Sequence, residues 1–347
     1  TPKPSSAASD VYKRQLISTD VERIKRIAAE MNRRGVHFTA DEMVEEYHQY
    51  VRRYSLFNFM QSIIISLRGR ERLRTAETYA AALASFRRFR NGEDIVIDAI
   101  NADIIEDYEA YLKFRGVTPN TTSFYMRILR AVYNRAVECG AVEQCHPFRH
   151  VYTGVGKTAK RALSLSVIRK IKLLDLSALP QADYARDMFM MSFYFRGMSF
   201  IDMAFLRKTD LRCGYITYRR RKTGQTLVIK WTADMQEILD KYAMNPTEYL
   251  LPIIISNGVA DRVAYLRAGN HINYQLKKIA VMVGVTVPLT MYCARHSWAS
   301  AARAKGVPVS IISEGMGHDS EATTRIYLEA LDTSSVDKAN EKILRSL

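Results

Sequence analysis

Residues 291–298 read MYCARHSW, and the second half of the chain can be interpreted outward from this stretch. At helical spacing Tyr292 and Arg295 share one face, three residues apart, whereas the adjacent His296 points about 100° away. Tyr292 is therefore the expected neighbour of Arg295. Because a guanidinium is a planar fork of N–H donors that matches phosphate oxygens, Arg295 is a candidate phosphate ligand.

A short helix that carries a tyrosine is expected downstream. Gly317-His318 is typical of a helix end, and Ser320 can cap the helix that contains Tyr327, nine positions beyond the histidine. The chain has 20 tyrosines, and an arbitrary one is far more often a core or rim aromatic than a nucleophile. Taken with Arg295, however, His318 and Tyr327 indicate a phosphate-binding site beside a nucleophile.

A second arginine lies upstream, in the sequence FRG at residues 195–197. Ser199 and Asp202 have the spacing of a capping box, so Arg196 is expected in the turn just before a helix N-terminus, where backbone N–H groups favour an anion. The alternative is that Arg196 simply pairs with an acid such as Asp202. The two roles can coexist, and both interpretations stay open.

Two short strands with a basic turn between them follow. Residues 214–218 and 226–230 alternate, and residues 222–225, KTGQ, are typical of a hairpin tip. Lys222 is therefore expected on an exposed turn. A lysine there is ordinarily only solvated, so its interpretation as a catalytic acid depends on the residues around it.

The first half of the chain has the periodicity of helices and predicts a small helical bundle. The expected helices lie between Val21 and Gly35, from Thr39 through Tyr50, from Tyr79 to Gly92, from Asn101 to Gly116 and from Pro119 to Gly140. On the last of them Arg127, Arg130, Asn134 and Arg135 could line a side that faces DNA. The alternative is a merely solvated face.

Changes in composition predict the domain organisation. Residues 1–18 are rich in Ser, Ala and Pro, so we expect an irregular segment, and residues 6–15 resemble a translated sequencing-adapter remnant that is not native. Residues 19–143 are the helical bundle, and residues 144–160 break periodicity as a linker does. Residues 161–347 are mixed, with helices near 165–174 and 183–195, the strand pair, and helices again. The fold class is mainly α with a small β-sheet (α+β).

The charge of the chain favours a polyanionic partner. The formal net charge is +15, and between Lys157 and Lys230 sixteen Lys and Arg face five Asp and no Glu, a net +11 around Arg196 and Lys222. Arg219 and Arg221 are further candidate DNA contacts in this segment. We expect double-stranded DNA as the partner.

Other classes of protein find no support in the sequence. No stretch approaches the roughly 18 apolar residues of a membrane span, and residues 1–7 lack the apolar core of a signal peptide, so we expect no membrane partner and a cytoplasmic, nucleoid-associated location. The four cysteines have neither C-x-x-C spacing nor a histidine pair, which predicts reduced thiols and no metal. We expect no cofactor.

The ordered set Arg196, Lys222, Arg295, His318 and Tyr327 resembles the tyrosine recombinase (phage integrase) family. The resemblance covers the chain from about Thr39 to the end and is greatest to integrases of conjugative transposons and prophages. It implies that the helical half is a SAM-like core-binding domain and that the second half is the tyrosine-recombinase catalytic domain.

The resemblance also implies a role for each matched residue. Tyr327 would attack the scissile phosphodiester and leave a 3′-phosphotyrosyl link and a free 5′-hydroxyl, while Arg196 and Arg295 would bracket the nonbridging oxygens. Lys222 would protonate the departing oxygen, and His318 would bond the phosphate or assist the nucleophile. Asp202 would orient an arginine. The product would be an integrated or excised mobile element.

One position departs from the family pattern. Most members have a histidine three residues before the second arginine, where this chain has Tyr292. A phenol with an ordinary pKa of about 10 is no base near neutrality, although its hydroxyl could donate a hydrogen bond to phosphate. Either His318 or the local positive field could promote deprotonation of Tyr327, and this choice stays open.

The C-terminal residues suggest a contact between protomers. Val336, Ala339, Ile343, Leu344 and Leu347 form an apolar stripe, which could cover the chain's own core or dock on another copy. The resemblance implies the second: monomers that associate weakly when free form a tetramer on two duplexes, with DNA-bending accessory proteins as further candidate partners. Two other functions stay open, DNA relaxation of the type IB topoisomerase kind and DNA binding without catalysis.

Overall fold

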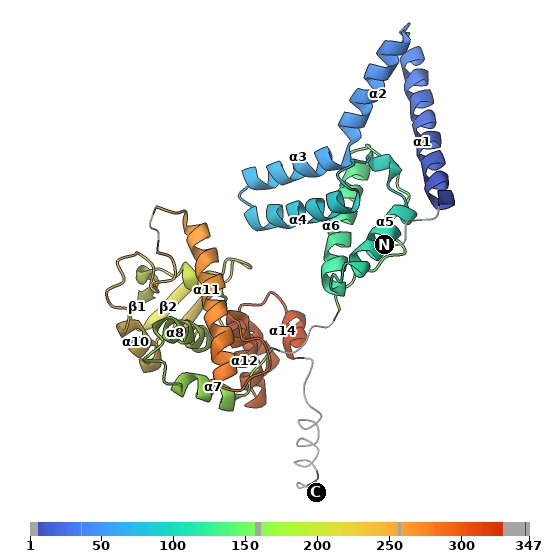
Figure 1. Cartoon of the computed structure of the whole chain (residues 1–347). Coiled ribbons are helices and arrows are strands. Elements are labelled where there is room, and N and C mark those ends of the chain that lie inside the picture. Colours follow the sequence, from blue (N-terminus) through green and yellow to red (C-terminus); the bar gives the residue numbers. More distant parts are fainter. Residues whose placement is uncertain (1–5, 36, 157–160, 256–257, 329–343, 345–347) are drawn as a thin grey trace. The chain divides into compact units, whose positions relative to one another are not determined.

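The computed structural model describes residues 6–35, 37–156, 161–255, 258–328 and 344; the side chains of residues 6–16, 19, 326 and 327 lie outside this description. The chain divides into two compact units, residues 1–158 and 159–347. Each unit has its own hydrophobic core. The fold is mainly α with one three-stranded sheet, which confirms the expected fold class (Figure 1).

The first unit consists of helices. They are α1 (Ser6–Arg33), α2 (Ala40–Tyr54), α3 (Leu56–Gly69), α4 (Leu73–Phe89), α5 (Ala102–Phe114) and α6 (Pro119–Glu138), with a 3₁₀ turn η1 (Ile97–Ala99) before α5. The predicted capping box at Thr39 and Glu42 is confirmed, and Asn101 caps α5 by accepting from the Ile104 amide. Near-neighbour hydrogen bonds therefore decide where these helices begin.

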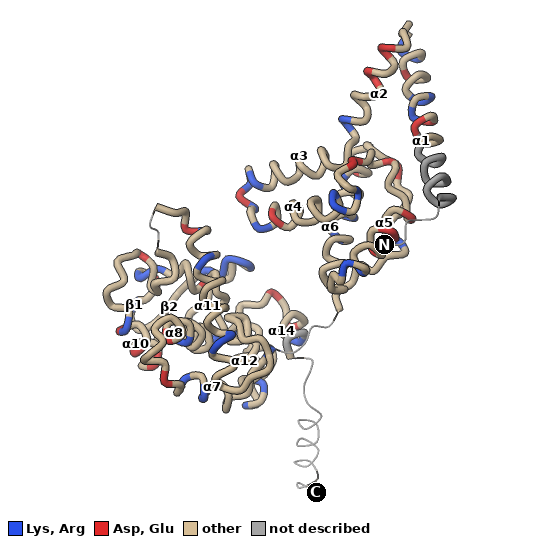
Figure 2. The backbone as a smooth tube through the Cα atoms, viewed as in Figure 1, with Lys and Arg blue, Asp and Glu red and all other residues tan. Residues whose placement is uncertain are grey.

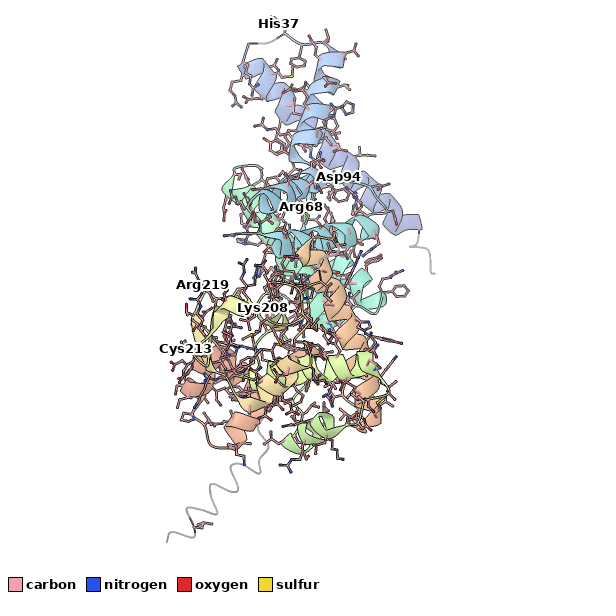
Figure 3. All side chains as sticks on the ribbon, turned by 90° about the vertical axis from the view of Figure 1, so that its left-hand side faces the viewer. His37, Arg68, Asp94, Lys208, Cys213 and Arg219 are labelled. Carbon is pink, nitrogen blue, oxygen red and sulfur yellow. The ribbon has the colours of Figure 1, made fainter. Side chains whose placement is uncertain are left out.

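The core of the first unit is built by α3 to α6. Phe86, Phe89 and Tyr108 pack ring against ring, and the buried Tyr108 hydroxyl donates to Ser85 Oγ at 2.8 Å. Asp94, labelled in Figure 3, accepts from the Ser55 hydroxyl and from the Phe57 amide at the start of α3. Burial of aromatic side chains with a satisfied polar tip stabilises such a small bundle.

The expectation of an irregular N-terminal segment is wrong for residues 6–18, which belong to α1. Residues 6–18 contain no Pro or Gly, so nothing interrupts the helical periodicity that begins near Val21. Basic and acidic residues are interspersed along α1 and α2 (Figure 2). Arg23 of α1 donates to Asp98, which also accepts from the hydroxyl of Tyr50 of α2. These bonds tie α1 and α2 to the rest of the bundle.

The segment expected to be a linker packs in part on the first unit. Phe148 and Val151 are buried in its core. Asn120 of α6 bonds the backbone of Gly156, and the hydroxyl of Tyr133 donates to the carbonyl of Glu143. Residues 144–156 thus lie with α6.

The second unit surrounds helix α8 (Figure 1). Its helices are α7 (Leu165–Leu173), α8 (Pro180–Tyr194), α9 (Phe200–Ala204), α10 (Ala233–Asp240), α11 (Asp261–Met282), α12 (Met291–Ala304), α13 (Val309–Gly315) and α14 (Glu321–Leu328), with a 3₁₀ turn η2 (Lys208–Asp210). Helices α7, α10, α11 and α12 pack against α8, and α14 packs against α12 and α13. Nearly every side chain of α8 from Ala185 to Ser192 is buried, as expected of a central helix.

The predicted hairpin is confirmed. Strand β2 (Tyr215–Arg219) pairs antiparallel with β3 (Thr226–Lys230), with Thr217 opposite Val228, and a short β1 (Leu211–Arg212) that was not expected pairs with β2. In β2 the inward residues Ile216 and Tyr218 alternate with exposed ones. The alternation sends one face of the sheet to the core and the other to solvent.

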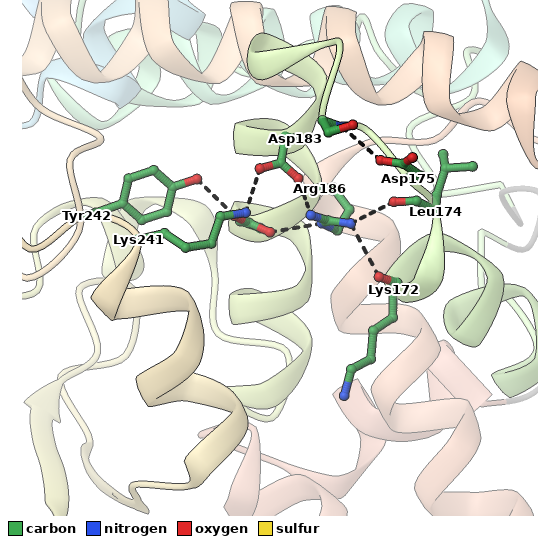
Figure 4. A network of polar contacts seen from close by, with 9 residues as sticks. Lys172, Leu174, Asp175, Asp183, Arg186, Lys241 and Tyr242 are labelled. Carbon is green, nitrogen blue, oxygen red and sulfur yellow. Dashed lines mark hydrogen bonds and ion pairs between the residues drawn. The ribbon is translucent and has the colours of Figure 1, made fainter.

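A network of polar contacts ties α8 to its neighbours (Figure 4). The buried carboxylate of Asp187 accepts from Arg186 at 2.8 Å and from the Tyr242 hydroxyl at 2.9 Å, and it also pairs with Lys241. Arg186 and Lys241 both pair with Asp183 as well. Burial, and then the charge of Asp187, raises the pKa of Tyr242, so its hydroxyl stays a donor. None of the helices that the structure describes is long and apolar enough to cross a bilayer.

The network predicts a large effect of Asp187→Asn on stability. Removing one partner of a buried ion pair leaves uncompensated charge and should lower the free energy of unfolding by about 3–5 kcal/mol. The matched control is Asp234→Asn, which breaks the exposed Lys172–Asp234 pair and should cost below about 1 kcal/mol. Tryptophan fluorescence in urea reports the second unit alone, because Trp231 and Trp298 both lie there. Equal midpoints for the two variants would contradict a structural role for the network.

Candidate active site

Arg295 lies at the centre of the candidate site. It is buried in the first half of α12, and its guanidinium donates to the carbonyl of Gly197 at 2.7 Å, to the carbonyl of Met316 at 2.8 Å and to His318 Nε2 at 2.7 Å. These partners come from the turn after α8 and the loop after α13. One side chain therefore holds three segments together.

The protonation of His318 follows from its hydrogen bonds with Arg295 and Thr324. A guanidinium has donors only, so Nε2 must accept from Arg295, and Nδ1 must then carry the proton that is donated to Thr324 Oγ1 at 2.6 Å. Burial, and then the charges of Arg295, Arg220 and Lys222, lowers the pKa of His318 to about 4. The imidazole is consequently neutral near pH 7.

Two glycines allow the backbone to approach closely. A Cβ on Gly197 would lie 2.7 Å from Cα of Arg295, and one on Gly317 would lie 2.8 Å from Cδ1 of Leu227. Both glycines also have a left-handed φ, of 71° and 63°. Any larger residue would separate the turn after α8 from α12, or the loop before α14 from the hairpin.

Arg196 presents a cation that none of the described residues neutralises. It is half-buried in the turn between α8 and α9, with a φ of 56°, and has no hydrogen-bond or ion-pair partner among the described residues. Burial raises the pKa of Tyr218, and the charges of Arg295, Arg220 and Arg196 each oppose this rise. A Cβ on Gly315 would lie 3.8 Å from Cδ of Arg196, and Arg295 donates to the carbonyl of Met316, so both arginines reach the end of α13.

The hairpin carries Lys222 to the same region. The buried guanidinium of Arg220 donates to the carbonyl of Gly317, and Thr223 Oγ1 donates to the same oxygen at 3.4 Å. Lys222 lies between them in sequence and is exposed, as predicted, and its charge reaches His318. Docking of the hairpin on Gly317 thus brings the charge of Lys222 within electrostatic range of the imidazole.

Asp202 supports the base of the hairpin. Its carboxylate accepts from the Ser199 hydroxyl at 2.6 Å and from the backbone amide of Arg221 at 2.9 Å. Ser199 in turn accepts from the Asp202 amide, so the predicted cap of α9 is present. Within the described residues the Asp202 carboxylate bonds only these two groups, and neither is the side chain of Arg196 or Arg295. Its expected contact with an arginine side chain is therefore absent from the described structure, because the carboxylate is directed to the hairpin backbone.

Tyr292 lies beside Arg295, as the helical spacing predicted. Both line a hollow of about 380 Å³, together with Asn270 and Asn273 of α11. The Tyr292 ring is 45% exposed and meets the edge of His296 at 4.5 Å between centroids. A phenol here can reach a ligand that enters the hollow.

Tyr327 lies in the last turn of α14, and its side chain is outside the described residues. The preceding turn of that helix is described: Thr324 is buried and bonded to His318, and the amide of Thr323 donates to the capping Ser320. The predicted capped helix is confirmed. The backbone of α14 is fixed against the same imidazole that holds Arg295.

Arg220 was not among the residues expected at the site. The structure buries it, leaves its Nε without a hydrogen-bond partner, and places no carboxylate of the described residues within ion-pair distance. Arg219 and Arg221, which were named as DNA contacts, are exposed on either side of it. The alternation of β2, in which Ile216 and Tyr218 face inward, could have identified Arg220 if continued two residues further.

The remaining candidate DNA contacts lie on exposed or partly exposed surfaces. Arg219, labelled in Figure 3, bonds the Gly224 carbonyl at 2.9 Å, and Arg221 lies over the ring of Phe205 at 4.0 Å. On α6 of the first unit, Arg130 and Arg135 are exposed, whereas Arg127 is half-buried with an unbonded Nε. No cluster of three or more His, Cys, Asp or Glu that could hold a metal lies within the described ranges.

The chain is similar to known recombinases in sequence. Residues 55–151 match the phage integrase SAM-like domain family. A tyrosine recombinase of Pseudothermotoga lettingae is 23% identical over 278 residues, which cover 77% of this chain and 91% of that protein.

Solved structures share the fold. A lambda integrase dimer bound to a COC′ core site superposes with a TM-score of 0.62 at 15% identity, over 79% of this chain and 95% of that one. The Tn1549 transposon integrase in complex with a circular intermediate DNA gives 0.61 at 14% identity, over 83% and 99%. A lambda integrase tetramer bound to a Holliday junction gives 0.60 at 16% identity, over 79% and 77%. At these identities the likeness establishes the arrangement of the backbone.

The buried imidazoles predict how stability depends on pH. Burial lowers the pKa of His296 and of His318 to about 4, against about 6.5 in an unfolded chain. Below pH 6.5 the unfolded state binds more protons, so these groups lower the stability of the second unit as the pH falls from about 6.5 to 4 and leave it unchanged above. The free energy of unfolding, measured by urea titration at several pH values, should fall less steeply between about pH 6.5 and 4 in His318→Asn than in the wild type. Above about pH 7 the two proteins should show the same dependence on pH. If the free energies of unfolding of the variant and the wild type ran parallel over the whole pH range, the assignment of a neutral buried His318 would be refuted.

Proposed function

We infer that this chain, which belongs to the tyrosine recombinase family, is a site-specific DNA recombinase that cleaves and rejoins strands through a phosphotyrosyl intermediate. The observation that carries this proposal is the half-buried Arg196, which lacks a hydrogen-bond or ion-pair partner among the described residues and precedes Gly197, whose carbonyl accepts from the buried Arg295. Cations withdrawn from water without a counter-charge are costly unless an anion completes the site. A backbone phosphodiester of DNA supplies such an anion.

The chemistry is an exchange of one ester for another. Tyr327 loses its phenolic proton to solvent and attacks phosphorus as the phenolate, the bond to the 5′-oxygen breaks, and Nζ of Lys222 gives that leaving oxygen its proton. Arg196 and Arg295 stabilise the charge that accumulates on the nonbridging oxygens. Exchange conserves the phosphoester bond energy, so rejoining is the same reaction in reverse, with the 5′-hydroxyl as nucleophile.

The hydrogen bonds of His318 favour one of the two roles that the sequence left open. Its Nε2 lone pair is occupied by Arg295 and its Nδ1 proton by Thr324, so it has no free site at which to accept the proton of Tyr327. We therefore assign His318 the task of holding Arg295. The surrounding cations, Arg196, Arg295, Arg220 and Lys222, favour the phenolate form of the nucleophile.

Tyr292 replaces the usual histidine as a hydrogen-bond donor. Its hydroxyl belongs to the wall of the hollow that Arg295 also lines, and its ring is open to solvent. A donor in this position can bond a phosphate oxygen without changing its own charge. Replacement of histidine by tyrosine therefore keeps the donor and removes a group that titrates near neutrality.

Exposed and partly exposed arginines of both units are the candidates for holding DNA. We propose that Arg219 and Arg221 of the hairpin, and Arg127, Arg130 and Arg135 of α6, contact backbone phosphates and so orient the duplex without reading sequence. The substrates are the paired attachment sites of a mobile element, which the enzyme integrates or excises. The fold shared with a transposon integrase supports this choice.

A covalent adduct tests the proposed chemistry. On a nicked suicide substrate the wild-type chain should form a protein–DNA adduct that resists denaturation, and Tyr327→Phe should abolish it because the nucleophile is lost. Tyr152→Phe, at an exposed tyrosine of the first unit, is the matched control and should react normally. A wild-type chain that binds the substrate but never forms the adduct would instead be a DNA-binding protein.

The same assay tests Arg196. Arg196→Lys keeps the charge but loses the bidentate fork, so adduct formation should slow by about 10²-fold. Arg169→Lys, on the exposed surface of α7, should react at the wild-type rate. A two-site plasmid then separates recombination from simple relaxation, since only recombination yields a resolved or inverted product.

We propose that the active assembly is a tetramer. Recombining two duplexes requires four strand cleavages, and each protomer contributes one Tyr327. The tail residues Val336, Ala339, Ile343 and Leu347 lie outside the described residues, and Leu344 is exposed. The tetramer seen for lambda integrase on a Holliday junction supports a protomer contact of this kind.

Deletion of residues 334–347 tests the protomer contact. The truncated chain should still form the adduct on one site, because Tyr327 and its neighbours remain, but should fail to pair two sites. Native gel electrophoresis with two labelled sites measures the pairing. Unchanged pairing would exclude the tail as the contact between protomers.

A further inference from the structure

Thr324 has a buried hydroxyl whose position the proposed chemistry does not explain. The residue is fully buried in α14, and its Oγ1 lies 2.6 Å from Nδ1 of His318. Neighbouring Thr323 is only half-buried, and its hydroxyl is 3.3 Å from Ser320 Oγ. Of these two adjacent threonines, only Thr324 faces the site.

The direction of the bond to Thr324 is determined by Arg295. Because Nε2 of His318 can only accept from a guanidinium, the neutral imidazole must carry its proton on Nδ1 and donate it to Thr324 Oγ1. The opposite tautomer would aim an N–H group at the N–H groups of Arg295. The hydroxyl oxygen of Thr324 is thus the acceptor that the inferred Nδ1–H tautomer requires.

We propose that Thr324 is a positioning residue of the cleavage site: it holds His318 in the Nδ1–H tautomer, so that Nε2 stays an acceptor for Arg295 and α14 is tied to that guanidinium. Tyr327 follows three residues later on the same helix, one turn away. The chain of bonds Arg295–His318–Thr324 therefore couples the phosphate ligand to the helix that carries the nucleophile. This inference rests on the proposed recombinase chemistry.

Loss of the Thr324 hydroxyl leaves His318 without a good alternative. With the proton on Nδ1, a buried N–H would have no acceptor, and with the proton on Nε2 the bond to Arg295 would be lost. Either outcome frees Arg295 or α14 to shift. Small displacements of groups that must meet at one phosphorus atom reduce rates strongly.

Three variants of the full chain test the proposal. Thr324→Val keeps the shape and removes the acceptor, and should slow adduct formation on the suicide substrate roughly 10- to 100-fold. Thr324→Ser restores the hydroxyl and should recover most of the rate. Thr323→Val is the matched control at the adjacent position and should react like the wild type. DNA affinity, measured by gel shift, should be the same for all four proteins.

Nitrogen NMR of histidine-labelled protein provides a readout that a merely structural role would not move. The His318 signals, assigned by their loss in His318→Asn, should show the Nδ1–H tautomer in the wild type and Thr324→Ser and a changed tautomer or mixture in Thr324→Val. Equal slowing by the Val and Ser variants, an unaffected Val variant, or an Nε2–H tautomer in the wild type would each overturn the proposal. The tautomer can be measured even if no adduct forms, so a failure of the proposed function is distinguishable from a failure of this inference.

Discussion

The site depends on a buried guanidinium that must find acceptors. Arg295 takes them from Gly197, Met316 and His318, which belong to two different connections of the second unit. A buried arginine with missing acceptors would be costly, so folding of the turn after α8 and of the loop after α13 is coupled to the placement of α12. The group that we propose as a phosphate ligand is therefore also the group that assembles the pocket.

Gly317 couples the hairpin to the same pocket, because its carbonyl is the acceptor for a second buried arginine. Its carbonyl accepts from Arg220 and Thr223, and its lack of a side chain lets Leu227 come close. The backbone of one residue thus connects the segment that leads to α14 with the strands that present Lys222. Three buried or half-buried arginines gather there, and among the described residues no acid forms an ion pair with Arg196 or Arg220. A bound polyanion would stabilise this arrangement, which is why we propose phosphate as its ligand.

Local features of the fold were predictable because they depend on near neighbours in the sequence. The capping box at Thr39, the cap of α9 at Ser199 and the hairpin near Lys222 each follow from residues within a few positions of one another. The N-terminal part of α1 was mispredicted because its composition resembles a linker although no Pro or Gly interrupts residues 6–18. Composition describes an average, whereas a helix needs only an uninterrupted run of compatible residues.

The sequence by itself determined which side chains we propose for the chemistry and their order along the chain, because residue type and helical or strand spacing are local properties. Only the tertiary structure decided which way those side chains bond. Arg220 turns inward to Gly317, 97 positions away, Asp202 holds the hairpin backbone, and the proton of His318 is directed to Thr324 by Arg295. These outcomes depend on donors and acceptors that are brought together by folding, and a hydrogen bond between distant residues leaves no periodic trace in the sequence.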